Sequence, residues 1–177
     1  MRRKKMYGIS VIIPTLNEAP RIGRLIERLR QAQPGPCEIL VADAYSSDDT
    51  AQRARDMSVG VVLCEQRSRA AQMNAGAKQA KGRVLYFVHA DTLPPPDYLQ
   101  RIADAVEAGV VMGCFRYRFD RDTWLLRLNA WFTRFDFLWC QGGDKSFFIR
   151  REAFEALGGY DENCVVMEEY YFLRKAM

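Results

Sequence analysis

Short apolar runs alternate with amphipathic segments along the first half of the chain. The apolar runs span 7–13, 38–42, 60–64 and 83–88. They are apolar on both faces, which is typical of strands buried in a parallel sheet. Each is followed by apolar residues at helical spacing, which predicts helices beginning near 22, 46, 68 and 98. This alternation predicts an α/β domain whose mostly parallel sheet is covered by helices.

The second half of the chain departs from this regular alternation. Residues 110–119 and 146–149 are typical of strands and 151–157 of a helix, while 167–169 opens a last helical segment. Residues 124–139 carry an apolar helical stripe rich in Trp and Phe. A helix that packs this stripe in the core or against a second copy of the chain would need no other function.

The strand predicted at 83–88 ends in an unusual way. It changes abruptly to His89-Ala-Asp91, and three prolines follow at 94–96. Ligands of open α/β sheets bind outside the carboxyl ends of the strands, where a carboxylate and an imidazole two residues apart can converge on one cation. The alternative is a turn in which Asp91 caps the next helix and His89 is a partly buried histidine.

Composition narrows the class of protein. The 177 residues, 49% hydrophobic and 27% charged, are typical of one soluble globular domain. No apolar run approaches the ~18 residues that cross a bilayer, so we expect neither a membrane span nor a signal peptide. The net charge of +4 suits anionic ligands but does not indicate nucleic acid. Five widely spaced cysteines predict reduced, mostly buried thiols in a cytoplasmic protein.

Polar residues follow the predicted strands at one common rim, and five segments there carry a resemblance to a known family. The segments are Ser10 to Glu18 (SVIIPTLNE), Glu38 to Asp43 with Ser46 to Asp48, Ser68 to Gly76, His89 to Thr92, and Met167 to Glu169. In this order and spacing they resemble the inverting family 2 glycosyltransferases of the GT-A fold. The chain is most similar to small soluble bacterial members that have His-Ala-Asp-Thr where most relatives have Asp-x-Asp.

The resemblance implies one Rossmann-like GT-A domain over residues 1–177. Its nucleotide-binding part would cover about 7–92 and its acceptor-side part about 93–177. The carboxyl end is short for the family, so we expect a truncated or minimal version of the domain.

The resemblance also implies which residues contact a nucleotide-sugar donor. They are Pro14, Thr15, Asn17, Glu18, Asp43, Arg69, Asn74, His89 and Asp91. The first four would lie near the ribose, Asp43 would accept a hydrogen bond from the base, and Arg69 would approach the diphosphate. The alternatives are helix caps for Glu18 and Asp43 and a solvated surface arginine for Arg69. Ala44, Tyr45 and Asp49 depart from the family pattern, which leaves the base open.

A divalent cation, Mn²⁺ or Mg²⁺, would bridge Asp91 to the donor phosphates and neutralise their charge. His89 stands where relatives have an aspartate. It would either ligate the cation, which favours Mn²⁺, or donate a hydrogen bond to the ribose or phosphate.

Inversion requires a carboxylate that removes the proton of the acceptor hydroxyl as the oxygen attacks. The family takes this base from a Glu-Asp pair, and Glu168-Glu169 stands in its place. We expect Glu169 to be the base, with Asp144 as an acceptor-side residue and reserve candidate. Adjacent glutamates at a helix start are also ordinary partners of the helix dipole.

The predicted function is therefore inverting transfer of a sugar from a nucleotide diphosphate, UDP first and GDP as the alternative, to an acceptor hydroxyl. The acceptor is open; 124–139 could contact the inner face of the membrane or hold a lipid-linked acceptor, and a homodimer is a further option. Two other functions stay open. A sugar-phosphate nucleotidyltransferase would have a Gly-rich basic loop after the first strand, which this chain lacks. A catalytically silent nucleotide-binding module would explain the departures at Ala44, His89 and Glu169.

Overall fold

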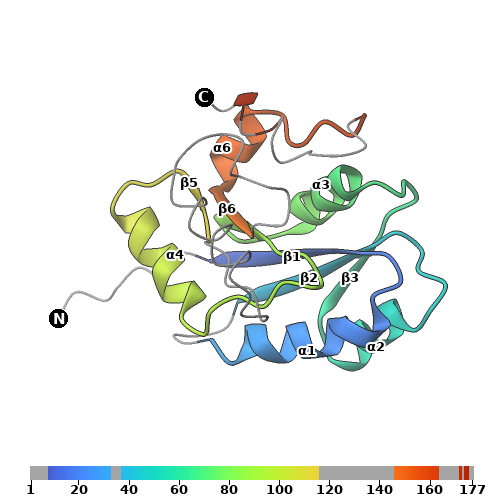
Figure 1. Cartoon of the computed structure of the whole chain (residues 1–177). Coiled ribbons are helices and arrows are strands. Elements are labelled where there is room, and N and C mark those ends of the chain that lie inside the picture. The colour runs from blue at the N-terminus through green and yellow to red at the C-terminus, as the bar shows by residue number, and fades with distance from the viewer. Residues whose placement is uncertain (1–7, 33–36, 116–145, 164–171, 173, 176–177) are drawn as a thin grey trace, which may run out of the picture.

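The computed structural model describes residues 8–32, 37–115, 146–163, 172 and 174–175. Figure 1 shows the arrangement of the helices and strands. The strands are β1 (Ile9–Thr15), β2 (Glu38–Asp43), β3 (Gly60–Leu63), β4 (Val84–Phe87), β5 (Met112–Cys114) and β6 (Phe147–Arg150). The helices are α1 (Ala19–Arg30), α2 (Thr50–Asp56), α3 (Arg69–Gln79), α4 (Tyr98–Glu107) and α6 (Arg151–Ala156).

The strands form a six-stranded sheet in the order β3-β2-β1-β4-β6-β5. Strands β3, β2, β1 and β4 run parallel, whereas β6 is antiparallel to β4 and β5 is antiparallel to β6. This arrangement confirms the predicted α/β class and the mostly parallel sheet. It also places β6, the last strand among the described residues, between β4 and β5 rather than at the edge of the sheet.

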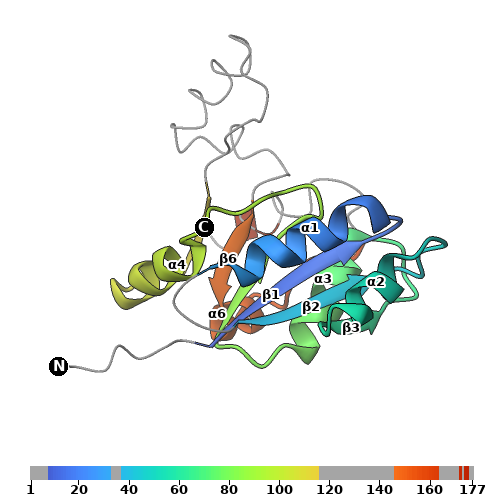
Figure 2. The ribbon, with the colours of Figure 1, turned by 90° about the horizontal axis from the view of Figure 1, so that it is seen from below.

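Helices cover both faces of the sheet (Figures 1 and 2). One core cluster packs α1, α2 and α4 against the face that carries Val11, Ile13 and Val41. The second packs α3 and α6 against the opposite face, with Ile12, Leu85 and Phe147 in its centre. Because successive side chains of a strand point to opposite faces, the continuous apolar runs of β1 and β4 fill both clusters.

Strand β1 ends two residues later than the pattern predicts, since it passes through Pro14 to Thr15. The carbonyl of Ile12 accepts a bond from the Val88 N–H of the β4 side. Alternation then turns the Pro14 nitrogen to the same side, where the β1–β4 pairing has already ended at Ile12–Phe87. A proline costs no ladder hydrogen bond at such a position.

Several expectations concern residues outside the described part of the chain. These are the later half of the strand predicted at 110–119, the aromatic segment 124–139, and the helical start at 167–169. Of the three described cysteines, none is in a disulfide; Cys64 is buried, Cys37 is half-buried and Cys114 is exposed, so the expected burial fails for Cys114. Among the described residues, no helix has the length and apolar character to cross a membrane.

Candidate active site

The parallel strands bring their polar carboxyl ends to one edge of the sheet. Thr15 of β1 is in register with Asp43 of β2, and β4 lies on the other side of β1. The His89–Asp91 turn follows β4 at this same edge. Helix α3 also begins here, after the loop that leaves β3. The predicted convergence of Thr15, Asp43 and Asp91 at one rim agrees with the topology.

Asp43 is the residue at this edge whose side chain links β1 to the turn after β2. It is 1% exposed, and its carboxylate accepts three hydrogen bonds. Thr15 Oγ1 donates to Oδ2 at 3.0 Å, while the Ser46 backbone N–H and Oγ donate to Oδ1 and Oδ2 at 2.9 and 2.6 Å. Three of its roughly four lone-pair sites are therefore occupied by the protein, which leaves one for a donor ligand. Asp43 caps the turn at Ser46 rather than a helix start.

Asn17 joins the loop after β1 to the loop after β2. Its φ is +57°, a left-handed conformation that asparagine tolerates better than most residues. Its backbone N–H donates to Ser46 Oγ at 2.9 Å, and its Oδ1 accepts from the Ser47 N–H at 2.8 Å and from Ser47 Oγ at 3.1 Å. The two loops consequently form one hydrogen-bonded unit.

Replacing Asn17 should show how much this unit contributes to stability. We expect Asn17→Ala to lower the free energy of unfolding by about 1–3 kcal/mol, because alanine loses the accepted bonds and is strained at positive φ. Asn17→Gly, which loses the same bonds without the strain, should cost less. Urea unfolding of both variants measures the difference. A glycine variant as unstable as the alanine variant would contradict the role of backbone strain.

Asp48 ties the start of α1 to the start of α2. Its Oδ1 accepts from the backbone N–H and the hydroxyl of Thr50, and its Oδ2 accepts from the Ala19 N–H at 3.1 Å. The bond from the Thr50 hydroxyl is the main cause that lowers the pKa of Asp48. Because the folded pKa is the lower one, the stability from this carboxylate is complete above the unfolded pKa. It is lost as the pH falls through the folded value.

Glu18 precedes α1 at the same edge, but its side chain makes no cap bond to the helix. Its carboxylate instead accepts from Arg21 Nη1 at 2.8 Å, and its backbone N–H donates to Thr50 Oγ1 at 2.8 Å. This hydrogen bond and the charge of Glu18 are the main causes that raise the pKa of Arg21, and the charge of Asp91 adds to them. The start of α1 therefore lies within electrostatic reach of Asp91.

The turn after β4 carries the two predicted cation-binding residues. The Thr92 N–H donates to the His89 carbonyl at 3.0 Å and closes the turn. His89 is 8% exposed, whereas Asp91 is exposed to solvent. The next helix, α4, has Asp97 as its N-cap residue, so Asp91 is not a helix cap.

The donor chemistry of this turn fits a hard divalent cation that is bound jointly with a ligand. In the described part of the chain, no three His, Cys, Asp or Glu residues lie together as a metal site. An exposed carboxylate with an imidazole two residues earlier in the chain would instead supply a few of the ligands, and phosphate oxygens and water would supply the others to Mg²⁺ or Mn²⁺.

Gln72, to which the sequence analysis assigned no role, fixes α3 to the edge. It is 4% exposed. Its Nε2 donates to the carbonyls of Thr15 at 2.6 Å and Ala42 at 2.8 Å. Gly76 permits this close approach, because an added Cβ would lie 2.5 Å from Ile12 Cγ2. A glutamine within an alanine-rich helix was the available signal, but its two backbone partners are visible only in the fold.

Two predicted donor contacts lie on α3. Arg69 is exposed at the first residue of the helix, next to the Ser68 cap, which accepts from the Ala71 N–H at 3.1 Å. Asn74 is one turn farther on and bonds the chain after α6. Its Nδ2 donates to the Tyr160 carbonyl, and its Oδ1 accepts from the Tyr160 N–H at 3.0 Å. Contact of Asn74 with a donor stays a prediction.

Comparison of the sequence with models of protein families identifies the family of the chain. Residues 10–162 match the model of glycosyl transferase family 2. The chain belongs to this family. The dolichol-phosphate mannosyltransferase of Pyrococcus furiosus is 32% identical to the chain over 107 residues, which are 57% of the chain and 30% of that protein.

Solved structures show the same fold for this family 2 chain. The mannosyltransferase PcManGT from Pyrobaculum calidifontis, in complex with GDP-Man and Mn²⁺, has a TM-score of 0.75 at 21% identity. The match covers 96% of the chain and 52% of PcManGT. S. aureus TarS 1–349 in complex with UDP has a TM-score of 0.75 at 20% identity, over 96% of the chain and 54% of TarS. The fold is therefore GT-A, and the chain spans about half of each structure.

One departure from the family pattern is visible in the edge of this family 2 domain. Tyr45, one of the residues that depart from the expected pattern, adopts a φ of +54° and is 51% exposed. A left-handed conformation costs a bulky residue roughly 1–2 kcal/mol. The hydrogen bonds of Asp43 to the neighbouring turn hold it there. The expected acceptor-side residues of the family, Asp144, Glu168 and Glu169, lie outside the described residues.

Proposed function

We propose that the chain is the catalytic domain of an inverting glycosyltransferase, which moves a sugar from a nucleotide diphosphate to an acceptor hydroxyl. The observation that carries the proposal is the meeting of Asp43, the Asn17 loop and Asp91 at one edge of a family 2 domain. Residues 7–92 would bind the donor and 93–177 would face the acceptor.

The donor would lie along the ends of β2, β1 and β4. The hydrogen-bonded unit around Asn17 and Asp43 presents Tyr45 and Leu16 to solvent, 51% and 41% exposed, and these supply apolar surface for a nucleoside. Pro14, Thr15 and Glu18 would complete the ribose side, and Arg69 would bind the diphosphate. TarS was solved with UDP and PcManGT with GDP-Man, so uridine and guanosine are the two nucleosides to test.

Asp91 would hold a Mn²⁺ or Mg²⁺ ion, with His89 as a second ligand or as a hydrogen-bond donor. PcManGT was solved with Mn²⁺. The bound ion would supply positive charge to the diphosphate leaving group. Arg21, held by Glu18 and within electrostatic reach of Asp91, adds fixed positive charge on the same side of the edge.

The acceptor hydroxyl would attack the anomeric carbon as the bond from that carbon to the diphosphate oxygen breaks. The nucleotide diphosphate leaves with the bonding electrons, and the hydroxyl proton passes to a carboxylate on the opposite side of the sugar. We assign that carboxylate to Glu169, with Glu168 and Asp144 as the next candidates.

A panel of UDP- and GDP-sugars with and without Mn²⁺ tests the proposal. The expected result is turnover that depends on the cation, with inverted anomeric configuration in the product by NMR. Donor binding without turnover would indicate a silent nucleotide-binding module. If the chain shows no donor binding and no turnover, the assignment is refuted.

Glu169→Gln should lower kcat about 10²–10⁴-fold, because the amide cannot accept the acceptor proton. Donor-induced thermal stabilisation should persist, since the residue faces the acceptor. Glu168→Gln is the matched neighbour and should retain most of the activity. The reverse order of the two variants would transfer the role of base to Glu168.

A lipid-linked acceptor, in which a lipid phosphate carries the group with the attacking hydroxyl, is the acceptor class that we propose; the Pyrococcus furiosus relative is named for dolichol phosphate. The catalytic domain would then act at the cytoplasmic face of the membrane, with 124–139 as its contact surface. Whether it does so as a homodimer is a question for sedimentation analysis.

A further inference from the structure

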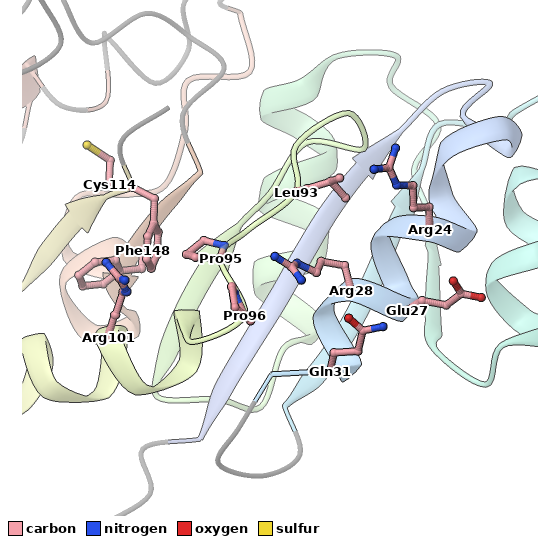
Figure 3. Close-up of a pocket in the computed structure, with 11 residues that line it drawn as sticks. Arg24, Glu27, Arg28, Gln31, Leu93, Pro95, Pro96, Arg101, Cys114 and Phe148 are labelled. Atoms are coloured by element: carbon pink, nitrogen blue, oxygen red, sulfur yellow. The ribbon is translucent and has the colours of Figure 1, made fainter. Parts of the chain in front are cut away.

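A cavity of about 1070 Å³ lies beside the turn that carries Asp91, between α1 and α4 (Figure 3). Its described lining includes Arg24, Arg28, Arg101, Leu93, Pro95 and Phe148. Neither Asp43 nor Asp91 is among these lining residues. The volume lies just above the range of typical ligand cavities, about 300–1,000 Å³. It is thus a second candidate site, next to the donor edge and separate from it.

Positive charge reaches this cavity from two helices. Arg24 and Arg28 extend from α1 toward the turn that carries Leu93 and Pro95, and Arg101 enters from α4 on the other side (Figure 3). Glu27 is the one carboxylate among the described lining residues, and it points away from that turn. The cavity therefore favours an anion.

The arginines differ in how much of each guanidinium the protein already uses. Arg28 Nε donates to the Pro94 carbonyl at 2.9 Å, which fixes the side chain and leaves its Nη groups for a ligand. Arg101 Nε pairs with Asp97 at 2.8 Å. Arg24 forms no ion pair or hydrogen bond with any residue that the structure describes. Fixed and uncommitted guanidinium groups side by side suit the oxygens of a phosphate.

The remaining wall of the cavity is apolar. Leu93 is 38% exposed, and Pro95 and Pro96 continue the same surface. Phe115 and Phe148, with ring centroids 6.4 Å apart, close it at the β5–β6 end. An inorganic anion would leave this surface in water, whereas an anion attached to a hydrocarbon chain would cover it.

The cavity also connects to the donor edge through α1. Arg21, Arg24 and Arg28 are spaced three and four residues apart, so they follow one face of the helix. Arg21, at one end of this row, lies within electrostatic reach of Asp91. A ligand whose phosphate lies at Arg24 would therefore approach the cation-binding turn along α1.

We propose that this cavity binds the phosphate of a lipid-linked acceptor, with Arg24 and Arg28 on the phosphate and the Leu93–Pro96 turn against the first part of the chain. The inference rests on the proposed function, because it names the place where that acceptor would bind.

Binding of farnesyl phosphate, a short isoprenoid phosphate, tests the site by titration calorimetry without any turnover. We expect saturable binding that Arg24→Gln weakens on the order of tenfold, the effect of losing one charged hydrogen bond. Arg55→Gln, which removes an arginine of α2 that is also exposed, is the matched control and should bind as the wild type does. Arg28→Gln tests the second arginine.

Two further probes separate the sources of affinity. Inorganic phosphate should bind much more weakly than farnesyl phosphate, and farnesol should bind without sensitivity to Arg24→Gln. Equal affinity for inorganic phosphate would reduce the cavity to an anion site and overturn the lipid assignment. An equal loss in Arg24→Gln and Arg55→Gln, or no binding by the wild type, would also overturn it.

Donor binding distinguishes failure of this inference from failure of the proposed function. Thermal stabilisation by UDP- or GDP-sugars with Mn²⁺ should be the same in Arg24→Gln as in the wild type. A chain that binds a donor but not farnesyl phosphate retains its proposed function and loses this site. A chain that binds farnesyl phosphate but no donor would keep this anion- and lipid-binding site and lose the proposed transferase function.

Discussion

Asp91→Asn is expected to abolish cation-dependent sugar transfer, with a loss in kcat of about 10²–10³-fold or more. The amide keeps the shape of the side chain but removes the charge that would hold a divalent cation on the diphosphate. Asp91 is exposed, and among the described residues its carboxylate accepts a hydrogen bond only from Thr92 Oγ1, at 3.4 Å, so the fold should be unaffected. Initial rates with and without Mn²⁺ measure the loss.

The control for this prediction is Asp56→Asn, which removes a carboxylate from the end of α2, away from the donor edge. Asp56 is exposed and accepts from Gln52 Nε2 at 2.7 Å. We expect this variant to have wild-type rates. If Asp91→Asn kept its dependence on Mn²⁺ with little loss of rate, the cation would have to bind elsewhere, and the proposed arrangement of the site would be wrong.

Asp43→Ala is expected to lower the free energy of unfolding by about 2–4 kcal/mol and to eliminate donor binding. The substitution leaves the Thr15 hydroxyl and both donors of Ser46 without their acceptor in a buried place. A buried donor without a partner costs about 1–3 kcal/mol. Water that enters the turn would bond some of the three donors, so the total loss is smaller than three such costs. Urea unfolding followed by circular dichroism measures the change.

Asp49→Ala provides the comparison, because Asp49 is the N-cap residue of α2 but makes no side-chain cap bond. This variant should change the free energy of unfolding by no more than about 0.5 kcal/mol, as for other exposed positions. Similar costs for the two variants would mean that the hydrogen bonds of Asp43 contribute little. Donor binding by a stable Asp43→Ala variant would remove the residue from the nucleoside site.

The predicted elements agree with the fold where a periodic pattern reports burial. The runs at 38–42 and 83–88 are close to β2 and β4, and the helical spacing after 68 is close to α3. Pro14 was the exception. A proline is a strand breaker on average, but here its nitrogen faces a neighbour that has already ended, which depends on the register with β4.

The candidate site was predictable as a set of positions and not as a set of contacts. Parallel strands have their carboxyl ends at one edge, so Asp43 and Asp91 could be assigned to that edge before any coordinates. The hydrogen bonds between Asn17 and the residues Ser46 and Ser47, and the two bonds of Gln72 to backbone carbonyls, join residues about 30 or more positions apart. No local pattern encodes such pairs.

By itself, then, the sequence determined the α/β class, the edge where the chemistry would lie and the family, because burial periodicity and motif spacing are properties of the chain. Only the tertiary structure decided that β6 inserts antiparallel between β4 and β5, that Asp43 is a buried hub, and that arginines of α1 and α4 share a cavity with a proline turn. These depend on which surfaces meet, and an apolar pattern indicates that a surface is buried without naming its partner.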